Sequence, residues 1–188
     1  MNTINSTADE LRIMTSGAFT AAYLELVPRL ELITKKKLVT LATSIGTGET
    51  SIPNRLRRGE PVDVVIVADA VLVGFIKEGL IIAESYTPVA RSAIGMAVRA
   101  GAPRPDISTV DALTRTLLQA HSIAYSASVS GEYLSNELLQ RLGIADQVLS
   151  KCRRIEGGER VGAVVARGEA EIGFQQISEL LPISGIDH

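Results

Sequence analysis

The stretch Leu11–Phe19, LRIMTSGAF, decides how the amino-terminal part of the chain folds. Residues 11–15 alternate in polarity and predict a strand that ends at the turn Ser16-Gly17. A helix follows, because apolar residues recur with helical periodicity up to Ile33. Strand and helix patterns alternate in this way along the rest of the chain. They predict an α/β protein with mainly parallel sheets, right-handed crossovers and helices on both faces.

Breaker residues and apolar runs divide the chain into two lobes. The β-branched run Pro61–Val67 predicts a fully buried strand of the first lobe. Extended residues then predict a crossing between lobes near residues 88–92, so we expect a first α/β lobe at residues 1–90 and a second at residues 91–180. In the second lobe, Ser108-Thr109-Val110-Asp111 predicts a capping box that opens a helix.

The composition excludes several classes of partner. With 19 Lys and Arg against 21 Asp and Glu, the net charge is −2, so no bulk positive field gathers nucleic acid or an anionic membrane. Three Phe, four Tyr and no Trp are too few for a stacking platform along a single strand. We therefore expect neither nucleic acid nor membrane insertion, since the longest apolar runs are also far shorter than the roughly 20 residues of a membrane-spanning helix.

The single cysteine, Cys152, excludes an internal disulfide and a thiolate metal cage. With only two histidines, the sequence offers no metal-ligand spacing, and we expect no metal and no cofactor. The first ten residues lack the basic start and apolar run of a secretory signal. As written, the chain is predicted to stay in the cytoplasm; it is periplasmic if a signal segment has been removed.

Three predicted turns share one design, in which a strand ends in Ser, Thr or Gly and a helix begins. Ligands of open α/β sheets lie beyond the carboxyl ends of the strands, where helix amino termini aim N–H groups at them. Hydroxyls add donors without bulk, and glycines allow close approach. The alternative is that each hydroxyl only caps its helix. The ligand-binding candidates in these turns are Ser16, Gly17, Thr47, Gly48, Thr50, Ser126, Ser128 and Ser130.

The whole chain resembles a type 2 periplasmic-binding-protein fold, closest to the family of molybdate-transport solute-binding proteins. The residues that carry the resemblance are the strand into Ser16-Gly17, the turn Gly46–Thr50, and the runs 58–66, 90–98 and 168–174. The resemblance implies two Rossmann-like lobes around an anion cleft, with a chain that finally returns to the first lobe. It also implies that residues 181–188 start this return crossing and that the first lobe is incomplete at its carboxyl terminus.

Two departures from that family point away from molybdate. Glu49 stands in a turn where family members carry small hydroxyl residues, and a carboxylate repels a tetrahedral dianion. Gln175 and Gln176 stand near the position of a family Tyr ligand, and a strand directs only one of them to each side. An amide donates and accepts, so we expect a ligand with its own donors, such as a hydroxy- or polycarboxylic acid. Arg91, at the lobe crossing, is a further candidate, with a surface ion pair as its alternative.

An enzyme is the alternative to a binding protein. The run Glu171–Leu180 resembles a branch of the same superfamily that includes aconitate-isomerase-like proteins. Moving a double bond beside a carboxylate requires a base that takes a proton and returns it elsewhere, and donors that hold the enolate-like charge. Glu49 is the candidate base, with a helix-terminus position as its alternative. The candidate donors are Ser16, Arg91, Ser126 and Ser128.

The resemblance also implies partners. A transport role implies the membrane component of an ABC transporter, whereas binding lobes of this type also act alone as regulatory sensors. An uncovered apolar flank on the incomplete first lobe favours self-association, so we expect a homo-oligomer.

Overall fold

The computed structural model describes residues 9–46, 48–156 and 158–188. The chain divides into two compact units, one that ends at Arg91 and one that begins at Ser92. Among the described residues, no helix is both long enough and apolar enough to cross a lipid bilayer.

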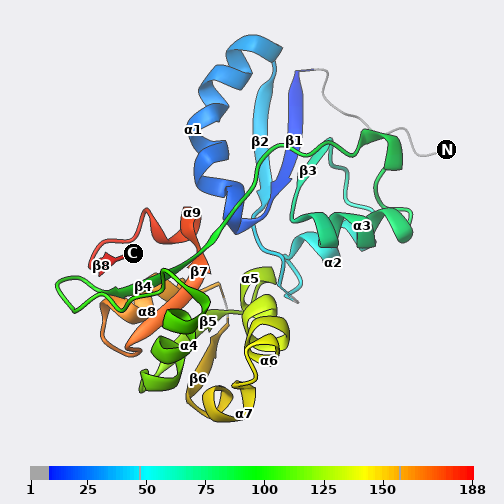
Figure 1. Ribbon diagram of the computed structural model, residues 1–188. Coiled ribbons are helices and arrows are strands. Elements are labelled where there is room, and N and C mark those ends of the chain that lie inside the picture. Colours follow the sequence, from blue (N-terminus) through cyan, green and yellow to red (C-terminus); the bar gives the residue numbers. More distant parts are fainter. Residues whose placement is uncertain (1–8, 47, 157) are drawn as a thin grey trace. The chain divides into compact units, whose positions relative to one another are not determined.

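The first unit is a parallel sheet of three strands in the order β2-β1-β3, with α1 on one side and α2 and α3 on the other (Figure 1). Its elements are β1 (Glu10–Thr15), α1 (Gly17–Thr34), β2 (Lys37–Ala42), α2 (Ile52–Arg57), β3 (Val64–Ile66), α3 (Asp69–Lys77) and the short helical turn η1 (Ala83–Ser85). Met14, Ile52 and Phe75 form the buried core between the sheet, α2 and α3. The Ser16 N–H donates to the Ile66 carbonyl at 2.8 Å, which places the first turn beside the end of β3.

The strand Pro61–Val67 is shorter and less buried than the sequence predicts. Only Val64–Ile66 form β3, and Val64 is 41% exposed. The prediction of a fully buried strand was wrong because β3 lies at the edge of the sheet and has a strand partner, β1, on one side only among the described residues.

The second unit is a mixed sheet in the order β6-β5-β7-β4-β8. The strands β6, β5 and β7 are parallel, whereas β4 pairs antiparallel with both β7 and β8. Its elements are β4 (Ile94–Arg99), α4 (Val110–Gln119), β5 (Ile123–Ser126), α5 (Val129–Tyr133), η2 (Leu134–Leu138), α6 (Leu139–Arg141), α7 (Ala145–Val148), η3 (Leu149–Lys151), β6 (Cys152–Ile155), α8 (Val161–Ala166), β7 (Ile172–Gln176), α9 (Ile177–Leu180) and β8 (Ile186–Asp187). The α/β prediction is confirmed, but the second sheet is not purely parallel.

Successive side chains of a strand point to opposite faces of the sheet, and in the second unit both faces carry apolar side chains. Helices therefore cover both faces of the second sheet. Ile123 packs into a core with the helices between α4 and α7, whereas Ala124 packs with α8. Gly173 lets α8 pack directly on β7, since a Cβ there would lie 2.6 Å from a methyl group of Val161.

Two predicted features of the second lobe differ in detail. The helix α4 is capped by Thr109, whose hydroxyl accepts from the Ala112 N–H at 3.1 Å, and not by Ser108 as the capping box predicts. At the end of the chain, Asp187 pairs with Val98, so residues 186–187 lie in the second unit. A return crossing of residues 181–188 to the first lobe stays a prediction.

Candidate functional site

In the second unit, the sheet topology gathers three helix starts at one edge. The parallel strands β5, β6 and β7 end at the same edge, and each leads there into a helix: α5, α8 and α9. In open α/β sheets this carboxyl edge is where ligands bind.

Three hydroxyls meet at the end of β5. Ser126 Oγ lies 2.7 Å from Ser128 Oγ and 2.9 Å from Ser130 Oγ, and the third side of the triangle is 3.3 Å. Ser126 and Ser130 are buried, whereas Ser128 is half-buried. A serine hydroxyl can rotate about its Cβ–Oγ bond, so each of the three could turn its hydrogen toward an anion without movement of the backbone. We call Ser126, Ser128 and Ser130 the serine cluster.

Gly131 holds the serine cluster together. A Cβ at this position would lie 1.7 Å from the Ser126 carbonyl oxygen and 2.7 Å from the Tyr125 ring. Only a residue without a side chain lets the start of α5 approach the end of β5 this closely. The short distances between the serine hydroxyls therefore depend on Gly131.

Ser128 occupies the N-cap position of α5, but its side chain makes no capping hydrogen bond to the helix. Thr109, at the same position of α4, does make one. The alternative in which a turn hydroxyl serves only as a cap therefore holds for Thr109 and not for Ser128.

Gln175 has partners within the second unit. It is 4% exposed, and its Oε1 accepts from the Val161 N–H at the start of α8 at 3.0 Å. Its side chain also bonds the half-buried carboxylate of Glu179 on α9. Burial raises the pKa of Glu179, against the opposing effects of the Gln175 bond and the Arg160 charge. Gln175 thus ties β7, α8 and α9 together, while its neighbour Gln176 is half-buried.

In the first unit, Ser16 stands at the N-cap of α1 and, like Ser128, makes no side-chain capping bond. Its backbone N–H donates a hydrogen bond to the Ile66 carbonyl, and its own carbonyl accepts hydrogen bonds from the Phe19 and Thr20 N–H groups. Ser16 and Gly17 are half-buried. The Ser16 hydroxyl is therefore not needed to begin the helix.

The second turn of the first unit is exposed. Thr47 lies outside the described residues, and Gly48, Glu49 and Thr50 are all exposed. The next residue, Ser51, is 1% exposed and its hydroxyl has no hydrogen-bond partner among the described residues. Sequence reasoning did not select Ser51, and its only signal was its position after the turn.

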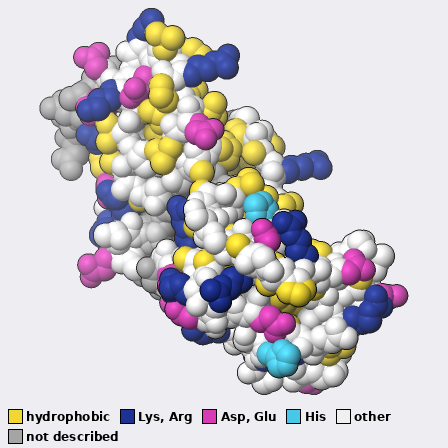
Figure 2. All heavy atoms as spheres, turned by 90° about the vertical axis from the view of Figure 1, so that its left-hand side faces the viewer, with side chains coloured by type: hydrophobic (Ala, Val, Ile, Leu, Met, Phe, Trp, Pro, Cys, Tyr) yellow, Lys and Arg dark blue, Asp and Glu magenta, His cyan; other side chains and the backbone are white. Residues whose placement is uncertain are grey.

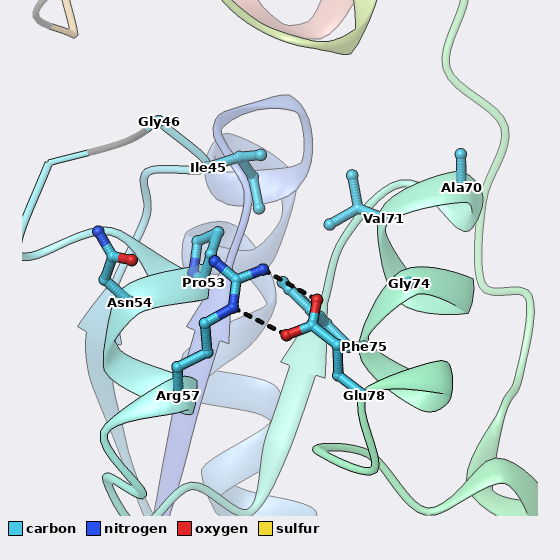
Figure 3. A pocket seen from close by; sticks show the side chains of 10 residues that line it. All are labelled: Ile45, Gly46, Pro53, Asn54, Arg57, Ala70, Val71, Gly74, Phe75 and Glu78. Atoms are coloured by element: carbon cyan, nitrogen blue, oxygen red, sulfur yellow. Dashed lines mark hydrogen bonds and ion pairs between the residues drawn. The ribbon is translucent and has the colours of Figure 1, made fainter.

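A cavity of about 330 Å³ lies beside this turn, between α2 and α3 (Figure 3). Ile45 and Gly46 line one side, and Arg57 and Glu78 join across it through two bonds of 2.8 Å. Among the described residues, none of the ligand-binding candidates lines this cavity, although Gly46 in its lining belongs to the same turn.

The structure gives no evidence of a functional role for Arg91, Cys152 or a metal site among the described residues. Arg91 is exposed. Burial raises the pKa of Cys152 to about 11, which leaves its thiol protonated and unreactive at neutral pH. No group of three or more His, Cys, Asp or Glu side chains in the described parts of the chain is arranged to hold a metal ion.

These observations define a class of protein: two α/β units that each carry a strand-to-helix turn whose N-cap hydroxyl does not cap its helix, in the type 2 periplasmic-binding-protein fold. The sequence pattern of one family, described as bacterial extracellular solute-binding protein, matches residues 11–187, and the chain belongs to this family.

Three known proteins illustrate what the chain resembles. An aconitate isomerase from Pseudomonas sp is 45% identical over 178 residues, which cover 94% of this chain and 68% of that relative. The Azotobacter vinelandii periplasmic molybdate-binding protein has a TM-score of 0.67 at 17% identity, with 90% of this chain and 72% of that chain covered. The Synechocystis PCC6803 CcmR regulatory domain in complex with 2-PG has a TM-score of 0.64 at 16% identity, with coverages of 95% and 78%. The two structural likenesses show the fold alone.

Proposed function

We propose that the chain binds a small anion with carboxylate or oxyanion groups, as a solute-binding protein. The observation that carries the proposal is that Ser16 and Ser128 occupy N-cap positions without capping their helices. Natural N-cap hydroxyls usually serve the helix, as Thr109 does here. The Ser128 hydroxyl bonds the other two hydroxyls of the serine cluster and not the helix, and the Ser16 hydroxyl makes no capping bond either, so a ligand can recruit both without undoing a helix cap.

The chemistry of the serine cluster suits an oxyanion or a carboxylate. Three neutral hydroxyls supply up to three donors within about one carboxylate width, and they add no charge to attract other ions. Glu49 stands in the exposed turn of the first unit and would repel a ligand made only of negative oxygens. A polycarboxylic acid with its own hydroxyl or with protonated oxygens fits both features.

The proposal assigns contacts to both units. Of the two glutamines, we retain Gln176 as a ligand contact, because Gln175 already bonds Val161 and Glu179. The full set of proposed contacts is Ser16, Gly17, Thr47, Gly48, Thr50, Arg91, Ser126, Ser128, Ser130 and Gln176.

Calorimetric titration with molybdate, sulfate, citrate, cis-aconitate and trans-aconitate tests this function. We expect saturable binding of at least one carboxylate and a loss of about tenfold or more in affinity for Ser126→Ala. Ser135→Ala is the matched control, because its hydroxyl bonds the Gly131 carbonyl farther along the same helical segment. Failure of the folded chain to bind any of the five anions would contradict the proposal.

A second candidate function is isomerisation of a small unsaturated carboxylic acid such as aconitate, which the 45% identity to an aconitate isomerase favours. In this reaction a base takes a proton from the carbon next to the double bond. The electron pair then shifts the double bond, and a proton returns at its far end. Glu49 is the proposed base, and the serine cluster is proposed to hold the charge that builds up on the carboxylate.

Proton NMR of cis-aconitate incubated with the chain separates the two functions. The enzyme converts it to trans-aconitate, and Glu49→Gln abolishes the conversion without abolishing binding. If the chain binds cis-aconitate without converting it, solute binding is its function and isomerisation is not.

The cellular location of the protein and its transporter partner are also part of the proposal. A solute-binding role with an ABC transporter membrane component requires export to the periplasm, whereas a regulatory sensor acts in the cytoplasm.

Self-association through the first unit stays a prediction. Figure 2 shows apolar side chains gathered in its upper part, and Leu32 and Ile33 of α1 are 67% and 65% exposed. Sedimentation of the wild type and of Leu32→Glu checks whether this surface joins two copies.

A further inference from the structure

A half-buried carboxyl group at the carboxyl edge of the second sheet has no part in the proposed anion site. Glu179 lies on α9, which follows β7 directly at this edge (Figure 1). Burial raises its pKa, and the Gln175 bond and the Arg160 charge oppose this rise without cancelling it. Glu179 therefore holds a proton more tightly than an ordinary glutamate does.

The Gln175 side chain connects Glu179 with the strand end that carries the serine cluster. The strands β5 and β7 are parallel neighbours, and in their register Tyr125 pairs with Phe174. The next residues along the two strands are Ser126 and Gln175, both buried. At the spacing of neighbouring strands they lie side by side, about 5 Å apart. Glu179 is thus one hydrogen-bonded side chain away from the strand residue that begins the cluster.

The Gln175 amide fixes the direction of this connection. Its Oε1 accepts from the Val161 N–H at 3.0 Å, so its NH₂ group donates to the Glu179 carboxylate. That bond favours the charged form of Glu179, whereas burial favours the neutral form. A negative ligand nearby acts in the same direction as burial, because it too disfavours the carboxylate.

Few charges face Glu179 from the elements that surround it. The helix α9 packs on β4, β7 and α8. No charged residue belongs to β7, and Arg99 of β4 stands at the end of that strand away from Gln175. Among the described residues, the charge that acts on Glu179 is that of Arg160, at the N-cap of α8.

The serine cluster has no free cation beside it to offset the charge of an anion. Its three hydroxyls are neutral. Arg154, on the neighbouring strand β6, is already paired with Glu132 of α5 at 3.1 Å and with Glu156 at 3.2 Å. An anion at the cluster and an ionised Glu179 therefore repel each other, and a proton on Glu179 removes this repulsion.

We propose that the second unit takes up a proton at Glu179 when an anion binds at the serine cluster. The affinity for the anion then rises as the pH falls, because the protonated carboxyl no longer repels the ligand. This inference rests on the proposed anion binding and adds its regulation by pH.

The direct test compares the wild type with Glu179→Gln, by calorimetric titration of the five anions named above between pH 5 and pH 8. The ionisation of a ligand acts equally on both chains, so the ratio of their dissociation constants isolates Glu179. Glutamine is neutral, as protonated glutamate is. We expect equal affinities near pH 5 and about fivefold or more weaker binding by the wild type at pH 8.

The outcomes separate this inference from the proposed function. If the wild type binds an anion and the ratio does not change with pH, proton uptake at Glu179 is overturned and anion binding stands. If the wild type binds none of the five anions at any pH, the proposed function fails and this inference fails with it.

Glu169→Gln is the matched control. It makes the same change of charge before the start of β7, where bonds from Arg167 and Arg153 lower the pKa of the carboxyl to about 2. Glu169 therefore stays charged from pH 5 to pH 8, and the ratio of wild type to this variant should not change with pH. A change as large as that for Glu179→Gln would overturn the assignment to Glu179.

A second measurement needs no variant. The NMR shift of the Glu179 carboxyl carbon in the wild type, followed against pH, reports the pKa of this group directly. Linkage is reciprocal, so an effect of about fivefold on affinity corresponds to a rise of about 0.7 in the pKa of Glu179 when the anion is bound. An unchanged pKa at saturation with an anion that binds would overturn the proposal.

Discussion

Thr109 and Ser128 occupy the same position in two helices of one unit and behave differently. Thr109 accepts a hydrogen bond from the Ala112 N–H and so completes the start of α4. Ser128 makes no such bond and turns instead to Ser126 and Ser130. The comparison teaches that an N-cap hydroxyl marks a candidate binding site when the helix does not use it.

The largest effect is expected from Gly131→Ala, which would force the start of α5 away from Ser126. Since the added Cβ meets backbone and a ring, neither of which can yield easily, we expect a loss of about 3 kcal/mol or more in unfolding free energy. Chemical denaturation measures it. The matched control is Gly74→Ala in α3, where the Cβ has open space; it should stabilise by up to about 1 kcal/mol. Equal effects of the two changes would refute the tight contact at Gly131.

Replacing each of the two side chains by the methyl group of alanine tests the comparison itself. Thr109→Ala removes a working cap and should reduce the unfolding free energy by about 1 kcal/mol while leaving anion affinity unchanged. Ser128→Ala should do the reverse: it reduces anion affinity and leaves thermal stability almost unchanged. The comparison fails if both variants lose stability equally and bind equally well.

The acid–base behaviour of Glu179 tests the neighbouring structure at the same sheet edge. Burial raises its pKa above the ordinary value of 4.5. The folded chain then binds this proton more tightly than the unfolded chain does, so the contribution to stability is complete below about pH 4.5 and is lost as the pH rises through the raised pKa. Denaturation of the wild type and Glu179→Gln across pH 4–7 measures it. The unfolding free energy of the variant should fall less steeply than that of the wild type as the pH rises. Parallel curves of unfolding free energy against pH would contradict the burial of this carboxyl.

The smallest effect is expected at the exposed pair of Arg57 and Glu78 in the first unit. Their side chains are 51% and 42% exposed, and water and salt screen pairs of this kind. We expect Glu78→Gln to leave both the melting temperature and anion affinity unchanged. A clear loss of anion affinity would instead connect the cavity beside α2 and α3 with ligand binding.

Much of the fold follows from the sequence because its signals are local. Alternating polarity predicts β1 at residues 11–15, and helical periodicity predicts α1 up to Ile33, within one residue of its observed end. The burial of β3 could not be predicted in this way, since it depends on which elements lie beside the strand. The choice of Thr109 over Ser108 as the cap likewise depends on backbone geometry that two adjacent hydroxyl residues do not reveal.

The candidate site was predicted in part. The turn pattern selected Ser126, Ser128 and Ser130, which the fold brings together. It did not select Gly131, whose role depends on the distance between a strand end and a helix start. Nor did it separate Gln175 from Gln176, because the direction of a strand side chain depends on register.

The most direct measurement of the central claim is a heteronuclear NMR titration of the full chain with citrate and with trans-aconitate. The account predicts saturable shifts that include the backbone amides of residues 126–131 and of residues 16–17, and much smaller shifts at residues 109–112. Shifts confined to other parts of the chain, with both serine turns unaffected at saturation, would contradict it.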